Sequence, residues 1–392
     1  MSRNSSVYTG DYVLLNASNF LYSLYATIFI FMPPFLDSIG LSPSRIGFVM
    51  ATGTFVSVAF KPLGGWLADR TNKVRFIIGG SIIASLSTLP WFFVQAPSGM
   101  LYLYRIFQGV GYSFFATFAY AHIASHAPQE RRAEALGVFG LSFFIPTAIG
   151  GWLGEATIAA FSFNTLFLMG ACVAFSSALP ALWMKDRVKK AGIGPSGVLK
   201  VLRRDILVYV LLALIFGTTF GGIFTFLPLF LFKEASDGIF IFLLFYSLSV
   251  ISTRTVWRKV VDSVDKDVSA ILSLSLLASG TALLMFSNDT LILIVASVIT
   301  GIGHGFLFPS LSALIVDEAG TENSGISMAL FTGAFDLGLV VGSGALGMVL
   351  EYGGFDVTFF SLSLLPLIGI PLLFRKRGKS ISPRPASSGK GE

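Results

Sequence analysis

One short polar stretch decides the fold: Gly64-Gly65-Trp66-Leu67-Ala68-Asp69-Arg70-Thr71-Asn72-Lys73-Val74-Arg75. It carries one carboxylate and three cations within seven positions. Apolar runs flank it from Ile46 to Leu63 and from Phe76 to Val94. Each run approaches the roughly 20 residues that a membrane-spanning helix requires. The stretch is therefore predicted to be a tight loop at a membrane surface.

The composition extends this prediction to the whole chain. Of the 392 residues, 54% are hydrophobic and 12% are charged, whereas soluble proteins carry roughly 25% charged residues. Twelve spans of about 25 residues would use roughly 300 residues and leave short connections. We predict an all-α polytopic membrane protein with twelve transmembrane helices. The single Cys172 lies in an apolar run, so we expect a packing residue and no disulfide.

The positive charges are distributed unevenly between loops. They cluster in alternate loops: Arg70, Lys73 and Arg75, Arg131 and Arg132, Lys185 to Arg204, Arg258, Lys259 and Lys266, and the tail from Arg375. The intervening loops carry only Arg45 and Lys233. This positive-inside pattern predicts cytoplasmic termini and accounts for the net charge of +6 without a nucleic-acid partner. The N-terminus lacks a signal-peptide pattern, so the first span is expected to be the targeting element.

The predicted boundaries follow the apolar runs. The spans are expected at about Tyr12–Leu36, Ser44–Leu67, the end of the hinge to Gln95, Leu101–Ser125, Ala133–Ala159, Asn164–Met184, Ile206–Phe232, Gly238–Trp257, Val268–Phe286, Leu291–Val316, Ser324–Glu351 and Phe355–Phe374. The first of them is expected to end at Pro33-Pro34. We divide the chain into a cytoplasmic N-terminus (1–10), two six-helix halves (11–184 and 206–376), a cytoplasmic linker (185–205) and a disordered tail (377–392).

An internal repeat supports the two halves. A shift of 193 residues places Lys61 on Arg254, Asp69 on Asp262 and Ala133–Gly140 on Ile326–Gly333. Repeats of this kind build transporters whose halves are related by an axis along the membrane normal. The halves are therefore predicted to be pseudo-symmetric.

Ionisable groups at membrane depth are the candidate functional residues. Asp336, near the middle of its span, can exchange a proton or contact substrate; the alternative is a carboxylate held by hydroxyls such as Thr332 or by a helix terminus. His304 lies among glycines, and it either titrates near physiological pH or is hydrogen-bonded in a close helix crossing. His122 lies about one turn from a span end and is expected to be interfacial.

Polar side chains also recur at helical spacing on two spans. Arg105, Gln108 and Tyr112 share one face of the fourth span, and Asn16 and Asn19 share a face of the first. Such faces normally line the bundle interior, so we assign these residues to a substrate and proton pathway. Arg105 would contact an anionic substrate group, a carboxylate or helix-terminal carbonyls.

Several chemistries find no support in the sequence. It contains no Walker A run, no cluster of metal ligands and no Ser/His/Asp constellation on a shared loop. We therefore expect no enzymatic activity, no ATP drive, no cofactor and no metal.

Four stretches resemble motifs of the major facilitator superfamily. The hinge matches its loop signature G-x-L-A-D-R-x-G-R-[KR] at Gly65, Leu67, Ala68, Asp69, Arg70 and Lys73. Asn72 replaces a turn glycine, and we expect it to be left-handed, as Asn tolerates that conformation. Arg105-Ile-Phe-Gln108-Gly109-Val-Gly111 resembles the family's R-x-x-Q-G-x-G. Pro146 and Gly150-Gly151 are a degenerate form of its antiporter motif, and the Asp336 region looks like the F-D-x-G run of bacterial exporters.

The resemblance implies a fold and a mechanism. The fold is two six-helix halves around a midplane cavity, nearest the bacterial sugar-efflux and drug:proton antiporters, in a prokaryotic cytoplasmic membrane. The gate would consist of Gly65, Asp69, Arg70, Lys73, Arg131 and Arg132, with Asp69 paired to loop cations and to the start of the eleventh span near Ser324.

We expect a monomeric secondary transporter that exports a small amphiphilic or sugar-like compound by alternating access, with protons as the coupling ion. An importer or uniporter without proton coupling is the first alternative. A membrane receptor or assembly factor that transports nothing is the second.

Overall fold

The computed structural model describes residues 8–68, 70–128, 131–186, 204–234, 238–257, 264–320 and 323–381, and within them it contains helices and no β-strand. The first half consists of α1 (Gly10–Ile28), η1 (Phe29–Phe31), α2 (Met32–Ser38), α3 (Pro43–Ala68), α4 (Lys73–Thr88), η2 (Leu89–Phe93), α5 (Met100–His126), α6 (Arg132–Leu141), α7 (Phe144–Ala160) and α8 (Phe163–Ala181). The second half consists of α10 (Arg204–Lys233), α11 (Gly238–Thr255), α13 (Lys266–Leu283), η4 (Leu284–Phe286), α14 (Thr290–Ala319) and α15 (Ser324–Ile381).

The number of spans agrees with the sequence. Ten described segments are long and apolar enough to cross a membrane. One of them, Ser324–Lys376, reverses near Gly354, whose φ of 75° favours glycine, so it holds two spans. α5 is the twelfth span. Although it carries polar side chains, it packs along α3 and α4. The prediction of a twelve-helix fold is confirmed.

Prolines explain where two spans are interrupted. Pro33 and Pro34 were expected to end the first span, but they occupy the first turn of α2, where a missing N–H costs nothing, and the chain stays helical to Ser38. The fifth span is broken into α6 and α7 at Ser142 and Phe143. Pro146 causes this break, because its ring conflicts with the carbonyl four residues earlier. At the other end of the chain, α15 continues to Ile381, five residues past the predicted span region, and residues 382–392 lie outside the described part.

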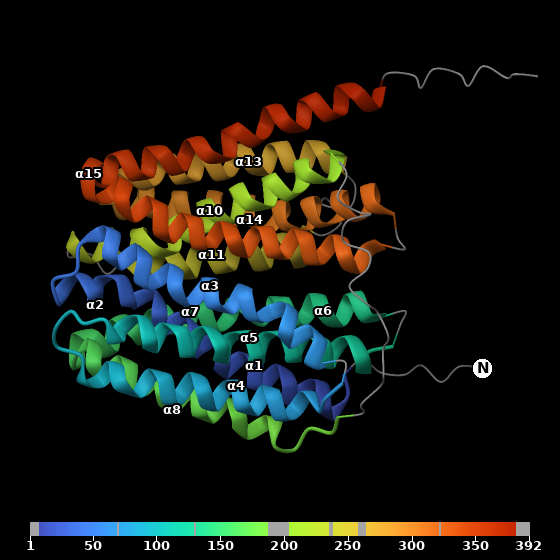
Figure 1. Cartoon of the computed structure of the whole chain (residues 1–392). Helices are drawn as coiled ribbons and strands as arrows, with labels where there is room; N and C mark the ends of the chain where they lie inside the picture. Colours follow the sequence, from blue (N-terminus) through green and yellow to red (C-terminus); the bar gives the residue numbers. More distant parts are fainter. Residues whose placement is uncertain are drawn as a thin grey trace, which may run out of the picture.

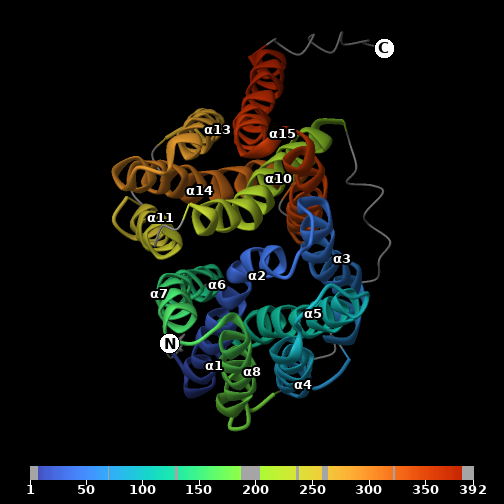
Figure 2. The same cartoon turned by 90° about the vertical axis from the view of Figure 1, so that its left-hand side faces the viewer.

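The helices form two groups (Figures 1 and 2). α1 to α8 make one half and α10 to α15 the other. Two helix pairs bring the halves together, α3 with α15 and α7 with α11, while α2 contacts α10. We call the end of the bundle where α1 begins and α15 ends the terminal face, on the right in Figure 1, and the opposite end the loop face.

Polar contacts join the two halves at the loop face. Lys233 Nζ lies 2.9 Å from Asp37 Oδ1. The hydroxyl of Ser42 and the backbone N–H of Ser44 each donate to Glu351 Oε2 at 3.0 Å. These contacts connect α2 with α10 and the start of α3 with the middle of α15.

Close backbone packing accompanies these contacts between α3 and α15. A Cβ atom added at Gly47 would lie 3.3 Å from both the Gly344 carbonyl oxygen and the Gly347 Cα, and against the Ser343 carbonyl. A Cβ at Gly347 would lie 2.7 Å from the carbonyl oxygen of Pro43. The two helices therefore approach each other at a distance that only glycine permits.

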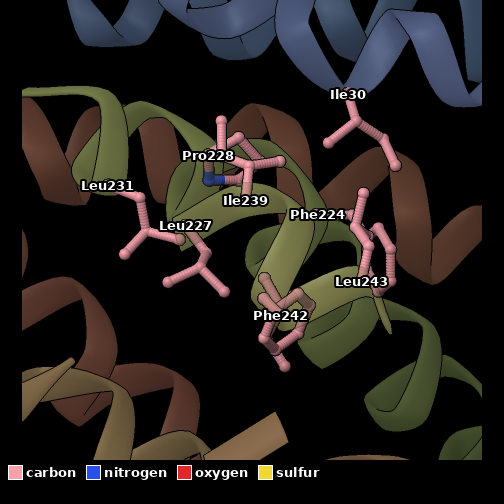
Figure 3. Close-up of a pocket in the computed structure, with 9 residues that line it drawn as sticks. Ile30, Phe224, Leu227, Pro228, Leu231, Ile239, Phe242 and Leu243 are labelled. Atoms are coloured by element: carbon pink, nitrogen blue, oxygen red, sulfur yellow. The ribbon is translucent and has the colours of Figure 1, made fainter. Parts of the chain in front are cut away.

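Apolar side chains complete the closure. η1 and α2 contribute Phe31 and Phe35 to a buried cluster that continues into α10 through Phe226 and Phe230. A cavity of about 10 Å³ lies within this region, between Ile30 and residues of α10 and α11. Figure 3 shows the side chains that line it. A cavity of that size without polar groups does not hold water stably. The loop face is thus sealed in this conformation.

Candidate functional site

The hinge from Gly65 to Lys73 connects α3 and α4 at the terminal face. Asn72 is extended rather than left-handed (φ −71°, ψ 113°), so that expectation is wrong. Its side chain instead accepts from the Arg75 N–H at 3.2 Å and caps α4, an ordinary role for Asn. Arg70 donates to the Trp66 carbonyl at 3.0 Å and lies over the Trp66 ring.

The remaining gate residues are only partly described. Asp69 lies outside the described residues, as does the side chain of Arg132. Arg131 is exposed and lies just before α6. The pairing of Asp69 with loop cations therefore stays a prediction.

Lys73 lies inside the first half rather than on its surface. Its side chain is 5% exposed, and its Nζ is 3.7 Å from Asp186 Oδ1. The Lys73 backbone N–H donates to the other oxygen of that carboxylate at 2.5 Å. His122, expected to be interfacial, is buried beside the same carboxylate, with Nδ1 3.9 Å from Oδ1. These contacts connect Lys73 at the start of α4 and Asp186, which follows α8, with His122 near the end of α5.

Among the described residues, one group of side chains at this place could bind a metal ion. Donor atoms of His122, His126 and Asp186 lie within 4.8 Å of one another. His126 Nδ1 is 2.9 Å from the His122 carbonyl, which leaves Nε2 as its available donor atom. Lys73 already supplies a positive charge to the carboxylate, whereas both ring nitrogens of His122 and the Nε2 of His126 are buried without a hydrogen-bond partner in the described part of the chain.

Arg105 is committed to packing within the first half. Its Nε and Nη2 donate to the carbonyls of Val49 and Met50 on α3 at 3.3 and 3.1 Å, and its Nη1 donates to Gln108 at 3.1 Å. A side chain at Gly53 would occupy the place of the guanidinium. These carbonyls lie within α3 and not at a helix terminus, where the alternative had placed them. Contact between Arg105 and an anionic substrate group stays a prediction.

The other polar residues of the predicted pathway divide into two kinds. Gln108 donates to Thr88 at 3.2 Å, and Asn19 donates to Ser142 at 2.8 Å, where the fifth span breaks. Asn16 bonds locally to the carbonyl of Tyr12. Tyr112 differs, because it is 43% exposed although its ring lies 6.2 Å from that of a buried tyrosine on α1. The Tyr112 side chain is therefore not enclosed by the first half.

Asp336 meets a cation from the opposite half. Lys61 on α3 forms an ion pair and a hydrogen bond with the Asp336 carboxylate on α15. The two side chains are 33% and 16% exposed. Asp336 lies twelve residues into α15, which places it about 18 Å along the helix from the terminal face. Thr332, the hydroxyl considered as a partner, donates to the Met328 carbonyl instead.

His304 is hydrogen-bonded within the second half. Its Nδ1 lies 2.5 Å from the Tyr246 hydroxyl on α11. Phe216 and Phe220 on α10 contact its ring edge-on, and it is 6% exposed. α14 and α11 cross closely here, since a Cβ at Gly301 would lie 2.7 Å from Ser249. The alternative of a hydrogen-bonded histidine in a close crossing describes this conformation.

Arg254, near the end of α11, is a second cation at the boundary between the halves. Its guanidinium carbon lies 5.5 Å from the Phe144 ring on α7 and 5.7 Å from the Phe308 ring on α14. Phe308 is eleven residues before the end of α14, about 16 Å along that helix from the terminal face. Tyr120, 47% exposed, is within electrostatic range of Arg254 and of the Lys61–Asp336 pair.

The sequence identified candidate site residues but not the side chains that contact them. It singled out Asp336 and His304 but not Lys61, Tyr246 or Arg254 as site residues. The internal repeat contained a signal, because it superposes Lys61 on Arg254 and both cations prove to lie between the halves.

This arrangement defines a class of protein. Two six-helix halves that meet around interior charges, closed at one face, have the architecture of a membrane transporter. A family model described as Major Facilitator Superfamily matches residues 14–269 and 235–392. The chain belongs to this superfamily.

Two related transporters support membership in this superfamily. The staphylopine export protein of Staphylococcus aureus (strain Mu50) is 22% identical over 384 residues, covering 94% of this chain and 95% of the relative. An uncharacterised MFS-type transporter of Escherichia coli K12, YhhS, is 25% identical over 364 residues, covering 90% and 89%.

Solved structures show the same fold. A mutant form of the nucleoside transporter NupG superposes with a TM-score of 0.77 at 13% identity, covering 93% of this chain and 99% of that one. A bacterial homologue of the human lysosomal transporter Spinster, inward-facing and unoccupied, gives a TM-score of 0.77 at 13% identity, covering 95% and 97%.

Proposed function

We propose that this protein is a secondary active transporter that exports a small amphiphilic or sugar-like compound by alternating access, driven by proton entry. It would act as a monomer in the cytoplasmic membrane of a prokaryote, with its terminal face in the cytoplasm. The positive charges of the loops support this orientation.

The observation that carries the proposal is the Lys61–Asp336 pair. A carboxylate and an ammonium group from different halves meet well inside the bundle, on one of the two helix pairs that join the halves. Ionisable groups at membrane depth mark ion pathways and proton relays. An ion pair in this position can couple proton binding to movement of the halves.

The coupling step follows from the chemistry of the pair. Substrate that binds from the terminal face would shift the halves towards the state with an open loop face, in which Lys61 and Asp336 separate. With the loop face open, the Asp336 carboxylate accepts a proton from outside as the substrate leaves, and the neutral acid allows the halves to return. Release of that proton towards the terminal face restores the charge of Asp336 and its pair with Lys61. The closed loop face and formed pair fit the state after proton release, ready to accept substrate from the cytoplasm.

The direction of transport rests on similarity together with this cycle. The relative from Staphylococcus aureus is named as an export protein, which supports export here. The exposed rings of Tyr112 and Tyr120 support an amphiphilic or sugar-like compound, because the apolar face of either kind of compound can stack on an aromatic ring.

The test begins with a thermal-shift screen in detergent, since a compound that binds the folded state alone raises its apparent stability. Flux of a compound found in this way is then measured in proteoliposomes with and without a pH gradient. We expect flux to follow the gradient in the wild type, and Asp336→Asn to lose that dependence.

A matched control is available on the surface. Asp317 pairs with Lys266 at an exposed position, so Asp317→Asn removes the same charge without touching the interior. It should transport like the wild type. Gradient-independent flux in the wild type would support an uncoupled importer or uniporter, and binding without any flux would support a receptor.

A further inference from the structure

The structure contains two pseudo-symmetric cations between the halves, but only one of them has an acidic partner within the described residues. The 193-residue repeat relates Lys61 to Arg254, and the same shift relates Asp336 to Phe143. Lys61 on α3 reaches across to α15, and Arg254 on α11 reaches across to the break between α6 and α7. The carboxylate present at the first position is therefore a phenyl ring at the second.

Arg254 lacks a counter-charge within the described part of the chain. Its Nε is buried there without a hydrogen-bond partner. The groups around it are the Phe144 and Phe308 rings, with Tyr120, Tyr246 and His304 in electrostatic range. None of these neighbours is an anion at neutral pH. Ionisable groups at this depth normally pair with one another or with backbone carbonyls. The guanidinium of Arg254 is therefore suited to bind an anion that the described part of the chain does not supply.

Access and geometry suit a bound anion. Arg254 is only partly buried, and Tyr120, which lies within electrostatic range of it, is 47% exposed. A guanidinium presents a planar fork of donors that binds carboxylates and related anions with two hydrogen bonds. The flanking phenyl rings favour an apolar, aromatic portion next to the anionic group.

We propose that Arg254 is the anion subsite of the transport cavity. It binds the carboxylate, sulfonate or comparable anionic group of the transported compound, in the place that Asp336 fills opposite Lys61. The substrate itself thus completes the second of two pseudo-symmetric charge pairs. This inference rests on the proposed transport function and adds a substrate class to it, an organic anion with an aromatic or otherwise apolar part.

The test compares two probes of nearly the same shape. Benzenesulfonate is permanently anionic, and benzenesulfonamide is its neutral counterpart at neutral pH. Thermal unfolding of the purified full-length protein in detergent is followed while each probe is titrated. The wild type should be stabilised by the sulfonate and not by the sulfonamide. Equal effects of the two probes, or no effect of the sulfonate, overturn the proposal.

Variants locate the binding site. Arg254→Gln should weaken sulfonate binding roughly 10- to 100-fold, because a hydrogen-bonded charge is lost. Arg254→Lys should restore part of it. Lys266→Gln removes the same charge from an exposed pair and should bind like the wild type. Wild-type binding by Arg254→Gln overturns the proposal.

A third variant tests the symmetry directly. Phe143→Glu places a carboxylate at the position that the repeat relates to Asp336, next to Phe144, whose ring contacts Arg254. The new carboxylate should compete with the probe and weaken binding at least 10-fold, whereas Phe143→Gln should not. Unchanged binding in Phe143→Glu contradicts the pseudo-symmetric site, and this result does not depend on how Arg254 variants fold.

The two proposals fail in different ways. Binding in detergent requires no gradient and no flux. Loss of the anion effect together with intact gradient-driven flux overturns the subsite alone. Anion binding without flux overturns the transport proposal alone.

Discussion

Closure of the loop face should depend on the absence of a side chain at Gly47. In Gly47→Val, the new Cβ would meet the Ser343 carbonyl and lie 3.3 Å from the Gly347 Cα, so α3 must move away from α15. Overpacking of this kind costs about 1–3 kcal/mol. That energy corresponds to a roughly 5- to 150-fold shift in the equilibrium away from the closed loop face.

The closed state can be measured by cross-linking across the loop face. Lys233 Nζ and Asp37 Oδ1 are 2.9 Å apart, so Asp37→Cys and Lys233→Cys place two thiols close together only when that face is closed. The single native cysteine, Cys172, is exposed and is first replaced by serine. A short bifunctional thiol reagent then reports the closed fraction. We expect Gly47→Val to lower the cross-linking rate by the factor given above.

The control uses a glycine with free space around it. A Cβ at Gly79 on α4 would have no neighbour within 4 Å in the described part of the chain. Gly79→Val should cross-link at the wild-type rate. If Gly47→Val does so as well, the close approach of α3 and α15 does not govern closure and the reasoning is refuted.

Three further predictions concern the polar contacts. Asp69→Asn should abolish transport while leaving expression intact, because it removes the carboxylate of the gate; wild-type flux in proteoliposomes would contradict this role. Lys73→Met should destabilise the protein by about 3–5 kcal/mol, because it leaves a buried carboxylate unpaired, whereas Lys266→Met at an exposed pair should cost about 0–1 kcal/mol. Equal melting temperatures of these two variants would argue against the buried pair. Tyr246→Phe should cost about 1–3 kcal/mol in thermal unfolding, because the His304 nitrogen loses its partner; an unchanged melting temperature would show that solvent replaces the hydroxyl.

The sequence predicted the spans well because their signal is local. Length and apolar content identify a membrane helix without knowledge of its neighbours. The start of α10, for example, was expected near Ile206 and lies at Arg204. The errors concern local geometry. At Asn72, capping of α4 determined the backbone conformation, and at Pro146 the ring broke a helix that the apolar pattern had treated as continuous.

The candidate site was predictable only as separate residues. Polar groups at membrane depth are rare enough to stand out, so Asp336, His304 and Arg105 could be found in the sequence. Their partners could not. Lys61 is 275 residues away from Asp336, and no sequence spacing indicates which side chains of the two halves contact each other.

The sequence by itself determined the class of fold, the number of spans and the two-half organisation. These depend on apolar length, on the distribution of loop charges and on an internal repeat, and all three can be recognised from the order of residues alone. The tertiary structure alone decided which charges meet. It paired Lys61 with Asp336, placed Arg254 among phenyl rings and closed the loop face through Gly47, because contacts between helices depend on how the two halves pack against each other.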